Sequence, residues 1–464
     1  MTRVDRSRLP VPFADPVFRL PAVQKLLLAS GLRVWTVEHR GLGVVTFLLI
    51  LPSGSGSDPA GRAGLSALTA DMLDEGSGDR SALDIQDALA RMGAELNTEV
   101  GPDATTLTLT TLTGFIEPAL ALFADIVATP ALEEADFLRV RELRLNRLAQ
   151  LRDMPPAIAD RVLLREIYRA HPYSHLSIGT ERGLRDASLG DLVGFHRRAY
   201  LPPRTVVIAV GDDTHERLAR GVESAFGGWR AGDTADAEGP DEPDTGSAAG
   251  SGDAPPERRL AVAHRSGAAQ SELRIGRLAA ARSTPDYHTL LVLNTVLGGQ
   301  FVSRINMNLR QDKGYTYGAR TSFDFRRGRG PFVLQASVHT SSTTDAVREA
   351  LGELEAIRGP RPVTPHELDT ARAALTRGFP RNFETAEQIA RGLAQLALYG
   401  LPDDYFEQFV PLVNAVTAAQ VTESASAYLD PSTMITAIVG DRDAFGSRLP
   451  SLGLGEAVEV PGLD

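Results

Sequence analysis

Apolar and polar positions alternate along the chain in two ways, and each way predicts one type of element. Short apolar runs with a period of two predict strands, whereas apolar residues three and four apart predict amphipathic helices. In the first half these patterns predict the following strands and helices: strands near 33–39, 44–52, 94–100, 104–112 and 205–211, and helices near 60–75 and 82–93. The first two strands are expected to pair as a hairpin through Gly41 and Gly43.

The second half shows the same kinds of pattern in a similar order. Its predicted elements are strands near 259–265, 271–279, 315–325, 331–339 and 433–439, and helices near 286–297 and 300–313. Paired strands that are separated by runs of helices are typical of α+β layers, with helices on one face of a mostly antiparallel sheet.

The two halves also repeat each other in sequence. The segment AYLPPRTVVIAVGD at 199–212 recurs as AYLDPSTMITAIVGD at 427–441, with one extra residue. The amphipathic segment Ala119–Ile126 matches Ala350–Ile357 at a similar offset of about 230 residues. We therefore expect an α+β protein of two tandem homologous domains, each a mostly antiparallel sheet with helices on one face.

Charge is distributed unevenly over the 464 residues. The net charge is −11, which argues against a general nucleic-acid binder, and residues 231–257 supply eight acidic residues with no Lys or Arg. This stretch is rich in Gly, Pro, Ser and Ala, so it is expected to be a disordered linker. The predicted organisation is a first domain at 12–230, the linker at 231–257 and a second domain at 258–450.

Several classes of site are excluded by composition and by missing motifs. There are no cysteines, which excludes disulfides, Cys-bound zinc, iron–sulfur clusters and thiol nucleophiles. The chain has no G-x-S-x-G elbow, no phosphate-binding loop and no G-x-G-x-x-G fingerprint. His171 and His175 are separated by Pro172 in a segment typical of a loop, so a shared metal-binding helix face is not expected.

No apolar run approaches the roughly 20 residues that would cross a bilayer. The N-terminal segment lacks the apolar core of a secretory signal, so a cytoplasmic location is expected.

Short segments spread along about 400 residues carry a resemblance to a known family. They are GLSALTADML at 64–73 with Gly76, RMGAELN at 91–97, HPY at 171–173, GTE at 179–181, LGGQFVSR at 297–304, and Leu309-Arg310 through Gly314-Tyr-Thr-Tyr317. In their order and spacing the chain resembles the insulinase/pitrilysin zinc peptidases. The resemblance implies two similar domains that form half of a clamshell around a chamber.

Catalysis in that family depends on an H-x-x-E-H helix, whose histidines bind Zn²⁺ while the Glu acts on the metal-bound water. The positions that align here are Ala67, Ala70 and Asp71, and the place of the third ligand falls at Asn146-Arg147. Alanine offers neither a ligand nor a base. The resemblance therefore implies that this chain binds no metal and hydrolyses no peptide on its own.

A second family feature is retained. Related enzymes carry an Arg and a Tyr seven residues apart that hydrogen-bond the substrate backbone, and Arg310 and Tyr317 match this pair. The apolar spacing of Phe301, Ile305 and Leu309 predicts a buried helix face before Arg310. Gly314 and Tyr317 should then lie at the helix stop and on the next strand. The alternative is a surface arginine that packs on a strand tyrosine.

Gly298 and Gly299 have two open interpretations. They either end a helix or form a flexible loop that touches substrate, as a Gly-rich stretch does in related non-catalytic subunits.

The resemblance implies a heterodimer, in which a homologous partner supplies Zn²⁺ and the base and this chain helps to bind peptide substrates. No cofactor is expected in this chain. Two alternatives remain: a non-enzymatic scaffold similar to the core subunits of the respiratory bc complex, and a homodimeric peptide-binding module.

Overall fold

The computed structural model describes residues 18–230 and 259–461. The helices and strands of the first half are β1 Gln24–Leu27, β2 Arg33–Glu38, β3 Val44–Leu51, α1 Leu65–Asp71, β4 Gly76–Ser77, β5 Arg80–Ser81, α2 Ala82–Arg91, β6 Glu95–Val100, β7 Thr105–Leu112, α3 Ile116–Ala128, α4 Glu134–Leu151, α5 Pro155–Tyr168, α6 Glu181–Asp186, α7 Leu189–Ala199, β8 Val206–Gly211 and α8 His215–Phe226.

The second half follows with β9 Arg259–His264, β10 Gln270–Leu278, α9 Tyr287–Leu297, α10 Arg304–Asn306, a π-helical turn Met307–Asp312, β11 Thr316–Phe323, β12 Pro331–His339, α11 Thr343–Ile357, α12 Pro365–Arg377, α13 Ala386–Tyr399, α14 Tyr405–Ala415, α15 Ala418–Tyr428, β13 Ile435–Gly440, α16 Arg442–Phe445 and β14 Ala457–Glu459.

Each half builds one main sheet from equivalent strands. Within the described residues the two six-stranded sheets have the orders β1-β2-β8-β3-β7-β6 and β11-β12-β10-β13-β9-β14. Read from opposite ends, β2, β8, β3, β7 and β6 correspond to β9, β13, β10, β12 and β11. Most neighbouring strands run antiparallel. The predicted α+β class and duplicated architecture are confirmed.

The predicted hairpin of the first two strands is wrong. β8 lies between β2 and β3, parallel to the first and antiparallel to the second. The loop at Gly41 and Gly43 instead crosses the end of β8, where the amide groups of both glycines donate 3.0 Å hydrogen bonds to the Asp212 carboxylate. In the second half Asp441 accepts in the same way from Gly267, also at 3.0 Å. The repeated Gly-Asp pair therefore fixes the loop that crosses the inserted strand.

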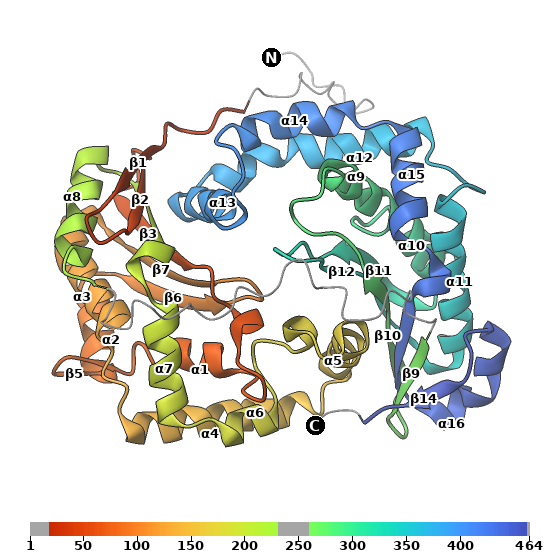
Figure 1. Cartoon of the computed structure of the whole chain (residues 1–464). Coiled ribbons are helices and arrows are strands. Elements are labelled where there is room, and N and C mark those ends of the chain that lie inside the picture. The colour runs from red at the N-terminus through yellow and green to blue at the C-terminus, as the bar shows by residue number, and fades with distance from the viewer. Residues whose placement is uncertain (1–17, 231–258, 462–464) are drawn as a thin grey trace, which may run out of the picture.

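One face of each sheet packs on helices of its own half. In β3, Phe47 and Leu49 belong to the apolar cluster that includes α3 and α8, whereas Leu48 and Ile50 point to the opposite face. That opposite face is covered by α13, which belongs to the second half in sequence (Figure 1).

The exchange is reciprocal. Helix α5 of the first half packs on the second sheet, where Ile158 and Val162 join Ala261 and Ile435 in one buried cluster (Figure 1). An Arg–carboxylate ion pair ties each exchanged helix to its sheet: Arg274 to Asp160 at 2.6 Å, and Arg391 to Glu99 at 2.9 Å. This second helical layer was not expected from the sequence.

A buried polar cluster joins the two halves at their junction. Asp103, which is 5% exposed, accepts hydrogen bonds from the hydroxyl of Tyr173 and from the backbone amide of Arg327 in the other half. Burial raises the pKa of Asp103, although these hydrogen bonds oppose that shift. The HPY segment of the sequence thus has a structural role, because Tyr173 satisfies a buried carboxylate between the halves.

The remaining sequence-based boundaries compare with the structure as follows. The acidic linker at 231–257 lies outside the described residues. The sheet of the second half includes β14, so that half continues past residue 450. Among the described helices, none is both long and apolar enough to cross a membrane.

Replacing Tyr173 by Phe should lower the free energy of unfolding by about 1–3 kcal/mol, because the buried Asp103 carboxylate loses a donor. Chemical unfolding monitored by circular dichroism measures the loss. Tyr317→Phe is the matched control, since the Tyr317 side chain is 91% exposed and its change should leave stability unaltered. Equal stability of both variants would contradict this role of Tyr173.

Candidate functional site

The helix that aligns with the zinc motif is α1, and its start is held by a buried carboxylate. Asp58 accepts hydrogen bonds from the backbone amides of Gly64, at 2.6 Å, and Ser66, at 2.7 Å. Burial raises the pKa of Asp58, opposed by nearby His175 and by these amides. His175 is thus placed beside a helix cap, with 3.8 Å between its Nε2 and an Asp58 oxygen.

Two segments of the family resemblance meet at this helix start. Gly64 has a positive φ of 101°, and a Cβ there would lie 2.8 Å from the Cα of Gly179. A Cβ on Gly179 would in turn lie 2.4 Å from the carbonyl oxygen of Ala63. Both glycines are therefore required for the close approach of the two backbones.

The aligned zinc positions do not fit a zinc ion. Ala67 and Ala70 are 4% and 1% exposed and pack in the interior. Asp71 forms an ion pair with Arg144 of α4, whose Nη2 also donates to the carbonyl of Ser177 at 2.8 Å. A guanidinium beside Asp71, together with alanine at the two other positions, opposes binding of a dication.

The helix expected to carry the third ligand, α4, does pass α1. The residue of α4 that pairs with α1 is Arg144, however, rather than Asn146 or Arg147. Asn146 and Arg147 are exposed, whereas the Arg144 side chain is only 11% exposed. Arg144 lies four residues after Val140 and four before Leu148, both of which are buried. A charged residue within that apolar stripe was the signal that sequence reasoning missed.

A second group of possible metal ligands lies in the second half. His264, Asp441 and Asp443 offer ligand atoms within 4.8 Å of one another. Both carboxylate oxygens of Asp441 already accept backbone amides, and His264 Nδ1 accepts from the amide of Arg442 at 3.2 Å. These contacts give the cluster a structural role, because its side chains hold neighbouring loop backbones together.

Arg310 lies in the π-helical turn Met307–Asp312 that follows α10. π-Helical turns are uncommon and frequent at functional sites. Ile305 and Leu309 are fully buried as expected, but Phe301 is 64% exposed, so the predicted three-residue stripe is wrong at its first member. The helix begins only at Arg304, because residues 299–303 form a turn after α9.

The Arg310 guanidinium has no hydrogen-bond acceptor or ion-pair partner among the described residues. Its recorded contact is with the Phe301 ring, whose centroid is 4.1 Å from the guanidinium carbon. Gly314 ends the turn with a φ of 67°, as predicted. Five N–H donors are therefore available to a bound molecule.

Tyr317 lies on the edge strand β11, where the register with β12 shifts between Thr316 and Ala319. Such β-bulges re-aim side chains and are frequent near active sites. The Tyr317 side chain is 91% exposed, which excludes it from the core. Neighbouring elements thus carry the guanidinium of Arg310 and the hydroxyl of Tyr317, and neither group has a hydrogen-bond partner within residues 18–230 and 259–461.

Gly298 and Gly299 are required by packing. A Cβ on Gly298 would lie 2.5 Å from the backbone nitrogen of Thr321, which donates to the carbonyl of Gly298 at 3.2 Å. A Cβ on Gly299 would lie 2.9 Å from Asn294 Nδ2. The end of α9 can therefore lie directly against β11, while a role of this turn in substrate contact stays a prediction.

The start of α10 is anchored by a buried arginine. Arg304, 8% exposed, binds Glu367 through two nitrogens at 2.6 and 2.8 Å and donates to the carbonyls of Arg361 and Pro362. Burial alone would raise the pKa of Glu367, but hydrogen bonds from Arg304 and Thr364 lower it to about 2. This ion pair fixes the segment that leads to Arg310.

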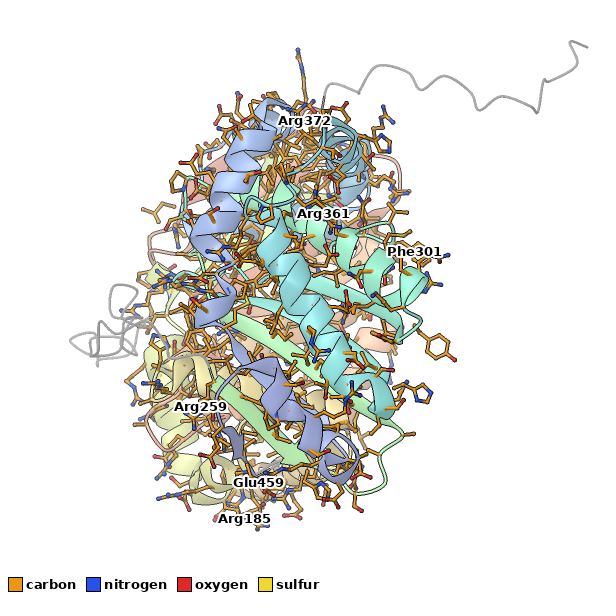
Figure 2. All side chains as sticks on the ribbon, turned by 90° about the vertical axis from the view of Figure 1, so that its right-hand side faces the viewer. Arg185, Arg259, Phe301, Arg361, Arg372 and Glu459 are labelled. Atoms are coloured by element: carbon orange, nitrogen blue, oxygen red, sulfur yellow. The ribbon has the colours of Figure 1, made fainter. Side chains whose placement is uncertain are left out.

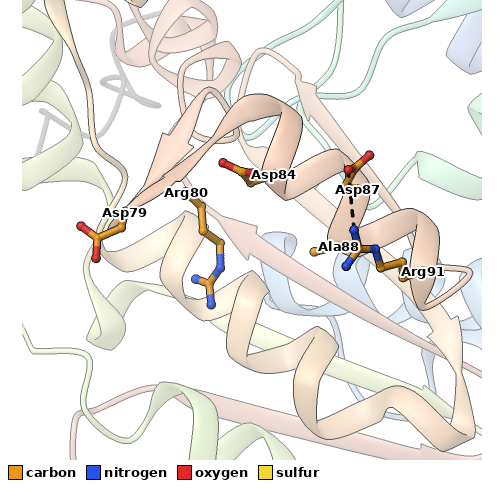
Figure 3. A pocket seen from close by; sticks show the side chains of 6 residues that line it. All are labelled: Asp79, Arg80, Asp84, Asp87, Ala88 and Arg91. Atoms are coloured by element: carbon orange, nitrogen blue, oxygen red, sulfur yellow. Dashed lines mark ion pairs between the residues drawn. The ribbon is translucent and has the colours of Figure 1, made fainter.

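A polar hollow of about 590 Å³ opens beside α2 (Figure 3). Its lining residues are Asp79, Arg80, Asp84, Asp87, Ala88 and Arg91. Arg80 pairs with Asp125 at 3.0 Å, Asp84 caps α2 through Ser81, and Asp87 lies 3.9 Å from Arg91. These contacts give Arg80, Asp84, Asp87 and Arg91 structural partners.

Comparison with known proteins gives consistent matches. The family model "Insulinase (Peptidase family M16)" matches residues 33–181, and "Peptidase M16 inactive domain" matches residues 186–375. An uncharacterized zinc protease of Mycobacterium tuberculosis is 26% identical over 413 residues, covering 89% of this chain and 92% of its own. The beta subunit of the rat (Rattus norvegicus) mitochondrial-processing peptidase is 26% identical over 223 residues, or 48% of this chain and 45% of its own.

Solved structures match over nearly the whole chain. A peptidase M16 inactive domain from Pseudomonas fluorescens has a TM-score of 0.79 and 26% identity, covering 90% of this chain and 98% of that structure. A protease from Helicobacter pylori has a TM-score of 0.82 at 19% identity, covering 91% and 100%, and supports the fold.

The Arg304–Glu367 pair predicts a pH-dependent stability. Because the folded-state pKa of Glu367 is below its ordinary value of 4.5, its contribution is complete above pH 4.5 and is lost as the pH falls toward 2. Glu367→Gln should therefore cost roughly 2–3 kcal/mol at pH 7 and progressively less in acid. Unfolding curves at several pH values test this. Glu216→Gln, whose side chain is 80% exposed, is the control and should change stability by less than about 0.5 kcal/mol.

Proposed function

The chain belongs to the insulinase family of peptidases, family M16, and on that premise we propose that it is the non-catalytic, substrate-binding subunit of a two-subunit zinc peptidase. A homologous partner with an intact H-x-x-E-H helix supplies Zn²⁺ and the general base. The observation that carries the proposal is the half-buried Arg310 guanidinium, which has no acceptor within the described residues.

An arginine without an acceptor is suited to a ligand that brings one. Arg310 can donate two parallel hydrogen bonds, and Tyr317 can donate one from its exposed hydroxyl. In peptide hydrolysis the carbonyl oxygen becomes negative in the tetrahedral intermediate. Donors already held in place stabilise that charge more than they stabilise the neutral carbonyl, and this difference accelerates the reaction.

Exposed sheet edges provide a place for the rest of the peptide. β6 and β11 each lie at one edge of the main sheet of their half; β6 lies against α1, and β11 carries Tyr317. An extended peptide can add to such an edge through main-chain hydrogen bonds, which gives broad sequence selectivity.

Because the partner supplies the zinc in this proposal, the aligned zinc positions of this chain need no metal ligands. With Ala67 and Ala70 in the interior and Asp71 paired to Arg144, this α1 is held together by packing and an ion pair. The fold needs no metal here, whereas the donors at Arg310 and Tyr317 would have no use in an idle scaffold.

The test is co-expression with a homologous chain that carries H-x-x-E-H, followed by zinc analysis and cleavage of a quenched fluorescent peptide. The isolated chain should contain no stoichiometric zinc and cleave nothing, whereas the complex should contain zinc and cleave. Within the complex, Arg310→Ala and Tyr317→Phe should each lower kcat by about 100-fold, with zinc content unchanged.

Arg182→Ala is the control, since the Arg182 side chain is 90% exposed and lies on α6 in the other half. Its activity should equal that of the unaltered complex. Zinc-dependent cleavage by the isolated chain, or full turnover in both site variants, would overturn the proposal. Inactive but stable complexes in every case would favour a scaffold.

A further inference from the structure

We propose that Phe301 is a positioning residue for Arg310: its ring holds the guanidinium in place while leaving all of its N–H groups free for substrate. The inference rests on the proposed function and adds to it a residue outside the Arg–Tyr pair. Figure 2 shows Phe301 at the right-hand edge of the molecule.

Phe301 does not pack in the hydrophobic core, so core packing does not explain an aromatic residue at this position. Its side chain is 64% exposed and it belongs to none of the buried apolar clusters of the described residues. The ring nevertheless lies over the Arg310 guanidinium at 4.1 Å. An exposed aromatic ring that contacts one functional side chain points to a role in placing that side chain.

A ring is chemically suited to this task in a way that a carboxylate is not. An Asp or Glu beside Arg310 would occupy the N–H groups and neutralise the charge that substrate requires. A ring face attracts the guanidinium through its π-electrons and restricts its rotamers, while the N–H groups at the guanidinium edge stay available. Arg144 shows the contrasting case, because its two terminal nitrogens donate to Asp71 and to the carbonyl of Ser177.

The backbone of the turn that carries Phe301 is anchored by the side chain of Asn306, which is 5% exposed. Its Nδ2 donates to the carbonyl of Phe301 at 2.6 Å, and its Oδ1 accepts from the amide of Ala319 at 3.0 Å. One side chain thus ties the turn that carries Phe301 to the bulge that carries Tyr317. Asn306 itself immediately precedes the π-helical turn of Arg310. The backbone segments that carry Phe301, Arg310 and Tyr317 are therefore linked at Asn306.

The same segment carries two further exposed apolar side chains, those of Val302, 59% exposed, and Met307, 37% exposed. Such exposed side chains could instead form a contact with the partner subunit. The two roles differ in what they change. Loss of a positioning contact alters turnover at full assembly, whereas loss of an interface contact alters the affinity between subunits.

The experiment uses the two-subunit complex and compares Phe301→Leu, which keeps an apolar side chain without a ring, with Phe301→Trp, which keeps a ring. Phe301→Leu should lower kcat about 3- to 30-fold at saturating partner, in line with a cation–π contact. Phe301→Trp should restore most of the activity. Val302→Ala, on the same turn, is the matched control and should leave kcat unchanged.

A double-mutant cycle gives the decisive readout. If Phe301 acts through Arg310, Phe301→Leu should cause little further loss in the Arg310→Ala complex. An equal loss in both backgrounds, unaltered kcat in Phe301→Leu, or a change confined to subunit affinity would overturn the inference alone. Full turnover in Arg310→Ala would overturn the inference, and full turnover in Tyr317→Phe as well would overturn the proposed function.

Discussion

Burial of the second face of each sheet is the constraint on which the rest of the molecule depends. A sheet whose strands are apolar on both sides must be covered on both sides, and each half of this chain covers only one of its own faces. The missing layer is supplied by α5 for the second sheet and by α13 for the first. Because each half completes the core of the other, the halves hold a fixed relative orientation. Asp103, with Tyr173 and the amide of Arg327, adds directional contacts at the same junction.

That orientation decides where the functional groups lie. α1 belongs to the first half and the turn of Arg310 to the second, so neither half alone defines the site. The two basic side chains have opposite environments. Arg144 pairs with Asp71, so the position aligned with the zinc motif holds a structural contact, whereas the contact of Arg310 among the described residues is with an aromatic ring. A guanidinium stabilises its own fold when its donors are satisfied internally, and it is suited to a ligand when they are not.

Much of the fold could be predicted from the sequence because it rests on local periodicity and on a repeat. The strands at 104–112 and 331–339 and the helix at 286–297 were placed within a residue or two. The failures are non-local. No periodicity could show that β8 enters between β2 and β3, since that pairing joins segments about 170 residues apart. The exchange of α5 and α13 could not be predicted for the same reason. Apolar spacing shows that a helix face is buried, but it does not show which element covers that face.

At the site, too, the sequence predicts the regular elements but not the position of every residue. The predicted positions of Arg310 and Gly314 at the end of a helix and of Tyr317 on the next strand are confirmed, whereas the prediction that Phe301 lies on a buried helix face is wrong. The departures from regular structure gather at this one place: a π-helical turn, a β-bulge, and the glycine at 298 that lets α9 lie against β11. Sequence patterns describe regular elements, so they fail where the chain departs from regularity. A π-helical turn and a β-bulge are both frequent at functional sites, and here they lie next to two side chains that have no hydrogen-bond partner among the described residues, which supports the proposed substrate role of Arg310 and Tyr317.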